Sequence, residues 1–265
     1  MTVTGLVPVA SETFEPPGPR DFDLPPVFGD SILFAKPALL LVLSAIVVLG
    51  FFLVTTRRMA MVPSKTQFAG EQAYGFVRNS IARDIIGTKD FLKFVPWLVA
   101  TFFFILLNNL FGIIPFIQFP SFSRVSFAYG LAALVWLLYN GLGVYKHGFF
   151  GYLKHVTVPN GVTGPILVLI IPLEFFSTVI VRPATLALRL FANMFAGHLL
   201  LILFTLGGEY LLLESSNVGY KAVGVVAFLL AVAISFLELL VQFLQAYVFT
   251  LLTAMYIQGA LAEEH

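Results

Sequence analysis

The sequence has no cysteine and very little charge. The absence of cysteine excludes disulfide bonds, thiolate metal sites and cysteine nucleophiles. Only 11% of the 265 residues are charged, whereas an ordinary soluble domain has ~25%, and 59% are hydrophobic. This composition predicts a polytopic membrane protein, because hydrocarbon accepts apolar side chains and disfavours charged ones.

The sequence also lacks the short motifs of several enzyme classes. It has no Walker A phosphate loop, no HExxH metal motif, no GxSxG nucleophile motif and no dinucleotide glycine fingerprint. We therefore expect no cofactor, no metal, no nucleic-acid partner and no hydrolytic activity of the chain by itself.

Three uncharged runs, each bounded by Lys or Arg, are long enough for one spanning helix, which needs ~20 residues. They comprise residues 37–56, 94–123 and 125–145. The second run is interrupted by prolines, which shortens the helix that it can form. We therefore expect all-α spans at about residues 33–56, 97–115 and 126–145.

Two further apolar stretches are much longer than one span. Residues 156–208 carry only three full charges, and residues 222–262 carry only Glu238. As continuous helices they would extend roughly 75 and 60 Å at ~1.5 Å per residue, against a hydrocarbon core of ~30 Å. Such helices must tilt steeply, bend or break, and Pro172 and Pro183 are candidate bends.

We expect the two stretches to form a long, steeply tilted helical hairpin. Its helices should cover about residues 164–206 and 222–262, joined by the polar turn "GGEYLLLESSN" at 207–217. The alternative is a pair of stacked spans with a re-entrant break. With the three shorter spans, the hairpin gives about five membrane segments.

Basic residues lie mainly in two loops, after the first and after the third expected span. They are Arg57, Arg58, Lys65, Arg78, Arg83, Lys89, Lys93, Lys146 and Lys154. By the positive-inside rule these loops are cytoplasmic, so residues 1–30, which carry five acidic residues against Arg20 alone, form an extracytoplasmic arm. The arm has neither a basic start nor an early apolar run, so we expect no cleavable signal peptide. Residues 31–265 should then form a single membrane domain with a cytoplasmic C-terminus.

Residues 66–90, "TQFAGEQAYGFVRNSIARDIIGTKD", mix charged and apolar side chains at near-helical spacing. This pattern predicts an interfacial amphipathic helix rather than a further span.

Two arginines lie within the first long stretch. Arg182 follows a cytoplasmic loop, so its side chain is expected to reach the membrane surface. Arg189 lies about 10 Å further along the helix. There the surface is harder to reach, so we expect a functional role, with a structural one as the alternative. At ~100° per residue, Asn193 shares the face of Arg189, whereas His198 lies on the opposite side.

Glu238, Gln242 and Gln245 follow the spacing i, i+4, i+7 and form a polar stripe on the last helix. If the two long helices are antiparallel and Arg189 is level with Gln245, His198 and Glu238 differ in depth by only about 3 Å. A His–Glu pair at one depth can exchange a proton near neutral pH. A static polar contact between the helices explains the pair equally well.

Other polar residues lie on either side of this level. Glu174, with Ser177 three residues on, lies on the cytoplasmic side, where it either lines an aqueous path or pairs with Arg182. Asn108 and Asn109 could line an outer path, although a lone Asn more often bonds a neighbouring helix.

Four segments resemble subunit a of F-type ATP synthases, the stator half of the proton channel. They are "LLNNLFGIIP" (106–115), "RPATLALRLF" (182–191), "LALRLFANMFAGHLL" (186–200) and "LLVQFLQAYVFTLLTAMYI" (239–257). The resemblance covers most of the chain from about residue 33 onward.

The resemblance implies a proton-translocating role without catalysis by the chain itself. It implies that Arg189 faces a carboxylate of the rotating c-ring and separates two offset proton half-channels. The implied outer half-channel contains Asn109, Asn193, His198, Glu238, Gln242 and Gln245, and the inner one contains Glu174 and Ser177. The implied partners are the c-ring, the peripheral-stalk subunit b and the remaining synthase subunits, in a bacterial plasma membrane.

Two departures from the family pattern bear on the proton path. Many bacterial members have Glu at the position of His198, and some have His at the position of Glu238, so the two residues are exchanged here. The reciprocal exchange favours a His–Glu proton relay over a static contact. Gly112 stands where some members carry an acid, so the outer path has one fewer titratable group.

Two other classes remain open from the sequence. A proton-coupled secondary transporter would explain the intramembrane Arg, His and Glu, although such folds usually contain internal repeats, and we find none. A structural membrane scaffold would not need a His–Glu pair at matched depth.

Overall fold

The computed structural model describes residues 17–18, 36–57, 60–88, 90–114, 117, 119–158, 166–214 and 217–262. Nearly all of the expected extracytoplasmic arm, residues 1–30, therefore lies outside the described residues. Within these described ranges five helices are long and apolar enough to cross a membrane, and the last two are by far the longest. The predicted fold class is confirmed.

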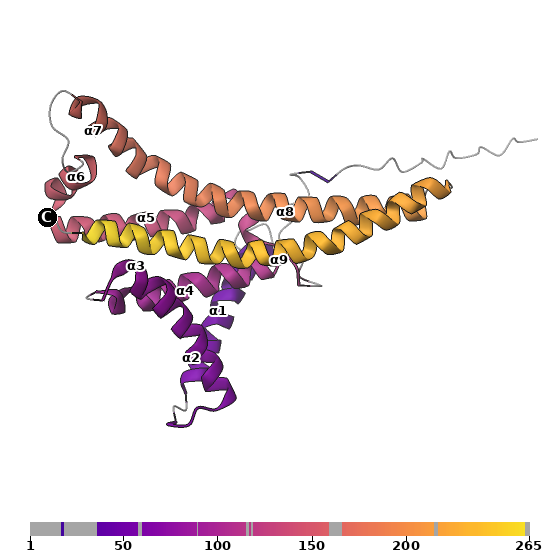
Figure 1. Ribbon diagram of the computed structural model, residues 1–265, viewed down its shortest axis with the longest axis horizontal. Coiled ribbons are helices and arrows are strands. Elements are labelled where there is room, and N and C mark those ends of the chain that lie inside the picture. The colour runs from indigo at the N-terminus through magenta and orange to yellow at the C-terminus, as the bar shows by residue number, and fades with distance from the viewer. Residues whose placement is uncertain are drawn as a thin grey trace, which may run out of the picture.

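The elements follow one another in the order drawn in Figure 1. The helices are α1 (Lys36–Thr56), α2 (Lys65–Val77), α3 (Asp84–Ile86), α4 (Phe91–Leu110), α5 (Val125–His147), α6 (Phe149–Thr157), α7 (Leu167–Phe176), α8 (Arg182–Leu213) and α9 (Val218–Leu261). Two π-helical segments, η3 (Arg78–Arg83) and η5 (Ser177–Val181), and one 3₁₀ turn, η4 (Ser121–Ser123), connect them.

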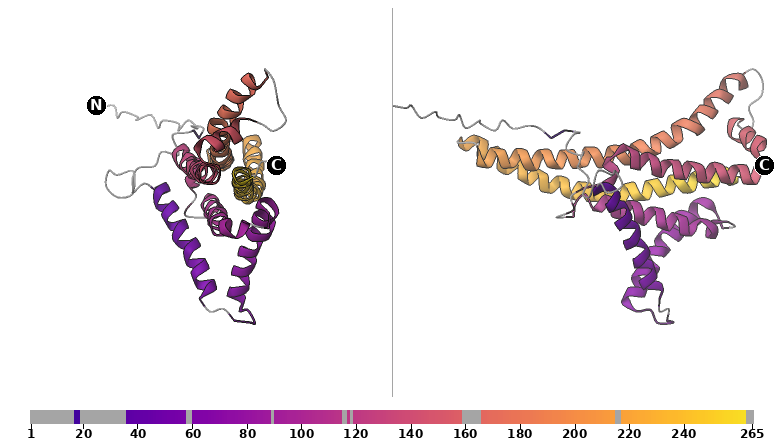
Figure 2. Two further views of the ribbon diagram at one scale, coloured as in Figure 1. Left: turned by 90° about the vertical axis from the view of Figure 1, so that its left-hand side faces the viewer. Right: turned by 180° about the vertical axis from the view of Figure 1, so that it is seen from behind.

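Four helices form the body of the molecule. α4, α5, α8 and α9 run along its long axis, whereas α1 and α2 leave it at a steep angle (Figures 1 and 2). Their shared core contains Phe102 of α4, Val135 of α5, Leu190 of α8 and Phe249 of α9. This four-helix core fixes the positions of the polar side chains described below.

The first long stretch bends between the two prolines that were predicted as bend sites. Residues 167–213 form one run of 47 helical residues, in which the π-helical segment η5 lies between Pro172 and Pro183. Proline removes a helical N–H donor, and π-helical turns absorb such breaks. As a result α7 climbs away from the body while α8 stays packed on it (Figure 1).

The turn between α8 and α9 is shorter than the predicted turn at 207–217. α8 continues to Leu213, seven residues past its predicted end at residue 206. Gly208 of α8 lies against Gly224 of α9, where a β-carbon on Gly224 would be only 3.0 Å from the carbonyl oxygen of Gly208. The polar sequence "GGEY" therefore marks a helix crossing rather than a turn.

The segment predicted as one amphipathic helix at 66–90 is divided. Ser64 caps α2 by accepting a hydrogen bond from the Gln67 N–H at 3.3 Å, and the helix then passes through η3 to α3. It ends at Gly87, whose φ of 89° suits glycine. α2 packs against α1 where Gly70 meets Thr55. Its predicted place at the membrane surface stays a prediction.

Candidate functional site

Arg189 projects from α8 on the side that faces away from the body. Its side chain is exposed, whereas Leu190, Met194 and His198 on the other side are buried. Among the described residues no carboxylate lies within ion-pair distance of Arg189. The ion pair found among them joins Lys93 to Asp90 at 2.8 Å. The described part of the chain therefore presents a guanidinium without a counter-ion from an apolar helix.

Asn193 connects α8 to α9 one turn beyond Arg189. Its Nδ2 donates a hydrogen bond of 2.7 Å to Oε1 of Gln245. Gln245 is 3% exposed and Asn193 is half-buried, so the bond lies at the edge of the helix interface. It fixes the antiparallel register close to the one predicted, in which Arg189 is level with Gln245.

A second set of two hydrogen bonds lies where α4 meets α9, one between the helices and one within α9. Nδ2 of Asn109 donates to the backbone oxygen of Gln242 at 3.3 Å, and Nε2 of Gln242 donates to Oε1 of Glu238 at 3.4 Å. All three side chains are buried, with exposures between 0% and 4%. The polar stripe predicted on the last helix therefore faces the inside of the bundle.

His198 and Glu238 lie on facing helices at nearly the same level. A β-carbon placed on Gly197 would lie 3.3 Å from Oε1 of Glu238, so this carboxylate rests against the backbone of α8 beside His198. Both side chains are about 5% exposed. The matched depth expected from residue counting is thus present.

Glu174 and Ser177 are not part of this group. Glu174 lies on α7 and Ser177 is the first residue of the bend segment η5, and both are half-buried. The possible Glu174–Arg182 ion pair is absent from the described residues; the Arg182 guanidinium instead lies over the Tyr256 ring, 5.9 Å from its centroid. The residues predicted for the outer path therefore form one cluster between α4, α8 and α9, called the outer cluster after that prediction, and Glu174 and Ser177 form a separate pair.

Comparison with known proteins decides the family. A family model described as ATP synthase A chain matches residues 38–258. The ATP synthase subunit a of Nocardioides sp. is 63% identical over 263 residues, which cover 95% of each chain. That of Pseudarthrobacter chlorophenolicus is 48% identical, and the match covers 96% of each chain. That of Streptomyces lividans is 44% identical, and the match covers 95% of this chain and 89% of the relative. The chain belongs to the ATP synthase A chain family.

Membership of the ATP synthase A chain family confirms the resemblance noted in the sequence. A bacterial subunit a is the proton-conducting stator subunit of the ATP synthase complex and is not catalytic on its own. The secondary-transporter and scaffold interpretations are therefore set aside.

Three buried polar residues of this ATP synthase A chain member, Ser44, Tyr139 and Thr178, were not singled out from the sequence, and the partner of Asn108 was not predicted. Asn108 donates to Oγ of Ser44 at 2.6 Å and so joins α4 to α1. The Tyr139 hydroxyl donates to the backbone oxygen of Thr178 at 3.1 Å and so joins α5 to η5. A lone serine within the apolar run of α1 was a detectable signal for the first bond, whereas no local pattern marks the second.

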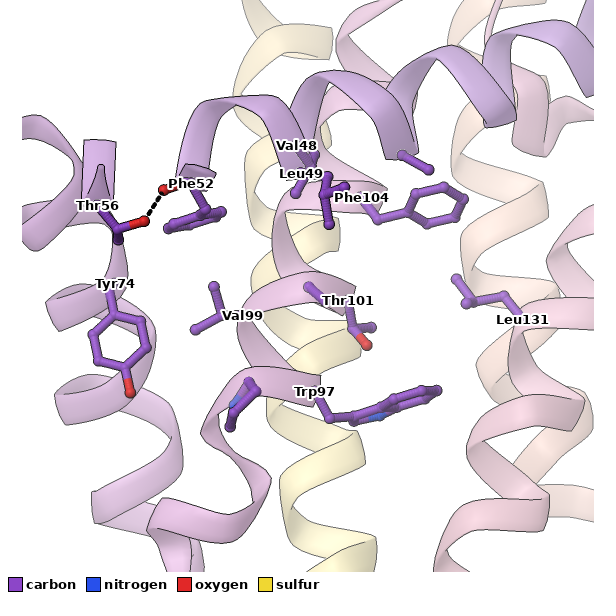
Figure 3. Close-up of a pocket in the computed structure, with 13 residues that line it drawn as sticks. Val48, Leu49, Phe52, Thr56, Tyr74, Trp97, Val99, Thr101, Phe104 and Leu131 are labelled. Atoms are coloured by element: carbon purple, nitrogen blue, oxygen red, sulfur yellow. Dashed lines mark hydrogen bonds between the residues drawn. The ribbon is translucent and has the colours of Figure 1, made fainter. Parts of the chain in front are cut away.

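A cavity of about 560 Å³ opens between α1, α2, α4 and α5 of this family member. Figure 3 shows the α1 residues Val48, Leu49 and Phe52 along its top with Phe104 beside them, Trp97 at its bottom, and Tyr74 and Leu131 at its two ends. The Thr56 hydroxyl at its margin donates a hydrogen bond of 2.7 Å to the backbone oxygen of Phe52. The lining is almost entirely apolar and lacks the convergent polar groups of a ligand site.

Proposed function

We propose that this chain provides two offset proton half-channels separated by Arg189, and that protons passing through them turn the c-ring. The observation that carries the proposal is the exposed Arg189, which has no carboxylate partner among the described residues. A charged side chain in hydrocarbon is costly and calls for a partner. A carboxylate on a rotor beside α8 would supply one.

The chemistry of the gate follows from the fixed positive charge. A guanidinium within ~4–6 Å of a carboxylate favours its ionised form. Each rotor carboxylate that reaches Arg189 would therefore release its proton before passing, and protons could not cross directly between the two paths. Arginine suits this task better than lysine because guanidinium stays protonated when poorly hydrated.

The outer half-channel would use the buried cluster between α4, α8 and α9. Protons would pass Asn109 and the His198–Glu238 pair and reach the rotor near Asn193 and Gln245, with Gln242 holding the Glu238 carboxylate. The pair supports a relay because imidazole and a neighbouring carboxylate exchange protons near neutral pH.

The inner half-channel would begin at the start of the bend. Glu174 and Ser177 are half-buried there, and Glu174 has no ion pair with Arg182 among the described residues. A carboxylate in this position can accept the proton that the rotor releases and pass it to water. This pair lies at the start of the bend segment η5 and the outer cluster lies beyond its end, as two offset paths require.

The long hairpin suits a surface laid against a cylindrical ring. Runs of 47 and 44 helical residues exceed what an upright helix needs, so steep tilt in the bilayer follows. The topology that agrees with this arrangement has the N-terminus outside the bacterial plasma membrane and the C-terminus in the cytoplasm. We expect the c-ring against α8 and α9 and peripheral-stalk subunit b elsewhere on the chain.

Replacing Arg189→Ala in the assembled synthase tests the gate. We expect ATP-driven proton pumping to be lost, while passive proton leak is retained or increased once the catalytic head is stripped off. Arg57→Ala, at the exposed end of α1, is the matched control and should pump normally. Normal pumping by Arg189→Ala would refute the proposal.

A further inference from the structure

The short turn η4 brings two serine hydroxyls into the interior. Ser121 is fully buried and Ser123 is 4% exposed, yet neither Oγ has a hydrogen-bond partner among the described residues. Leaving a buried hydroxyl without a hydrogen-bond partner destabilises the folded chain. Such groups in a native structure call for water or a ligand to bond them.

Phe122 explains why both serines point inward. Its ring is 1% exposed and packs edge-on against Phe104 of α4, with 6.1 Å between ring centroids. The turn is closed by the Ser123 N–H, which donates to the backbone oxygen of Pro120 at 3.0 Å. The anchored ring therefore holds the serines on both sides of it within the bundle.

The turn packs beside the start of the outer cluster. A β-carbon on Gly112 would lie 3.3 Å from Cβ of Pro120 and 3.2 Å from the backbone oxygen of Asn109. Pro120, which precedes Ser121, thus fills the space next to Asn109 that Gly112 leaves open. The turn also contacts α8, on which His198 lies.

Four further polar atoms on α4 and α9 are also buried and unpartnered among the described residues. They are Oδ1 of Asn108, Oδ1 of Asn109, Oε1 of Gln242 and Oε2 of Glu238, all buried and without hydrogen-bond partners among the described residues. A buried water typically makes about three hydrogen bonds to otherwise unsatisfied groups. These atoms lie on α4, which contacts η4, and on α9, which packs against α4, and buried groups of this kind are the environment that ordered water occupies.

We propose that η4 forms the rim of the outer proton entry, where the hydroxyls of Ser121 and Ser123 bind the water that leads to Asn109 and Glu238. This inference rests on the proposed function, because it names the mouth of the same outer half-channel. A serine hydroxyl both donates and accepts hydrogen bonds, so it can order water without holding the proton as a carboxylate would. The two hydroxyls would thereby take the place, at the entry, of the acidic side chain that some family members carry at the position of Gly112.

Single cysteines test whether water reaches the turn. The chain has no native cysteine, so Ser121→Cys and Ser123→Cys each introduce one thiol of nearly the same shape. Only the thiolate reacts, and it forms poorly in apolar surroundings. Silver ions and an anionic methanethiosulfonate, both added to the outer face of membranes with assembled synthase, report hydration; using both charges controls for the neighbouring Arg124.

Ser235→Cys is the matched control. Ser235 lies on α9 three residues before Glu238, and its hydroxyl already donates to the Ala231 oxygen at 2.9 Å. We expect the thiols at 121 and 123 to react at least about tenfold faster than the thiol at 235. Unreacted thiol is titrated after denaturation, so the measurement does not depend on activity.

Asn109→Cys distinguishes a failure of the proposed entry at η4 from a failure of the proposed outer half-channel. If it reacts rapidly from the outer face while the thiols at 121 and 123 are as slow as the control, an outer path exists but does not pass η4, and the inference fails. If the thiol at 109 is equally slow, the outer half-channel itself fails and the inference with it.

A second measurement covers the event that a cysteine variant does not assemble. The double change Ser121→Ala with Ser123→Ala should lower passive proton flux through head-stripped membranes roughly fivefold, since each removes one hydrogen bond from the water chain. Ser121→Thr with Ser123→Thr keeps both hydroxyls and should restore most of the flux. Unchanged flux in an assembled alanine variant would overturn the inference.

Discussion

Asn193 and Gln245 illustrate how one side-chain contact aligns two long helices. Their 2.7 Å hydrogen bond lies one turn from Arg189, at the edge of the interface between α8 and α9. An interhelical bond of this kind contributes about 0.6 kcal/mol on average in a membrane, so its value lies in position more than in stability. It holds the helix that carries the guanidinium in register with its neighbour.

The Asn193–Gln245 contact predicts coupled effects on proton pumping. Asn193→Ala and Gln245→Ala should each lower ATP-driven pumping, because each breaks the same bond. The double variant should be little worse than either single one, since residues that share an interaction are not additive. The rate of ATP-driven acidification measures all four chains, and effects that multiply would show that the two amides act independently.

Residue counting identified the polar stripe on the last helix but not the buried serines of η4. The stripe Glu238, Gln242 and Gln245 could be read from the sequence because helical spacing is local and the helix is unbroken. The serines of η4 could not, because their burial depends on Phe122 packing against a different helix. Long-range packing of this kind leaves no periodic signal in the chain.

At the scale of elements, the hairpin depends on a close approach near its turn. The β-carbon of an alanine at 224 would lie 2.8 Å from Cγ of Leu212 and 3.0 Å from the Gly208 oxygen. Backbone at this distance cannot move aside easily. The glycines that suggested a turn from sequence therefore serve helix packing, which is why α8 runs past its predicted end.

Gly224→Ala should destabilise the chain, whereas a matched change should not. We expect overpacking at 224 to cost about 1–3 kcal/mol. Gly130→Ala, in α5, meets no atom within 4 Å, and it should be neutral or stabilising by up to about 1 kcal/mol because alanine favours helix. Unfolding of the purified chain in detergent, followed by tryptophan fluorescence, measures both; equal stabilities would contradict the packing argument.

The bends were only partly predictable at this scale. Pro172 and Pro183 indicated that the first long stretch would not be straight, and η5 lies between them. The π-helical form of that segment was not predictable, because it is held by the Tyr139 hydroxyl on the Thr178 oxygen, a contact between residues 39 positions apart. Proline marks where a helix is weak, and tertiary contacts decide how it yields.

For the whole molecule, the angle between α1 and the four-helix body constrains its place in the bilayer. α1 has 21 residues, about the length of one upright span, and it leaves the body steeply (Figure 2). If α1 is nearly parallel to the membrane normal, α8 and α9 must be steeply inclined to that normal. The apolar lengths of both helices agree with this orientation, because a tilted helix passes through more hydrocarbon.

Spin labels on single introduced cysteines can measure this tilt in the assembled synthase. Along an upright α1, labels at the exposed positions Val42, Ile46 and Leu53 should change depth by about 1.5 Å per residue. Along α9, whose 44 residues must fit within ~30 Å of hydrocarbon, the change should be only about 0.7 Å per residue. Collision with oxygen and with a water-soluble relaxant gives the depth of each label, and α1 serves as the internal ruler. Equal slopes for α1 and α9 would mean that the hairpin stands upright and that its ends project into water. The proposed packing of a tilted hairpin against the ring would then have to be abandoned.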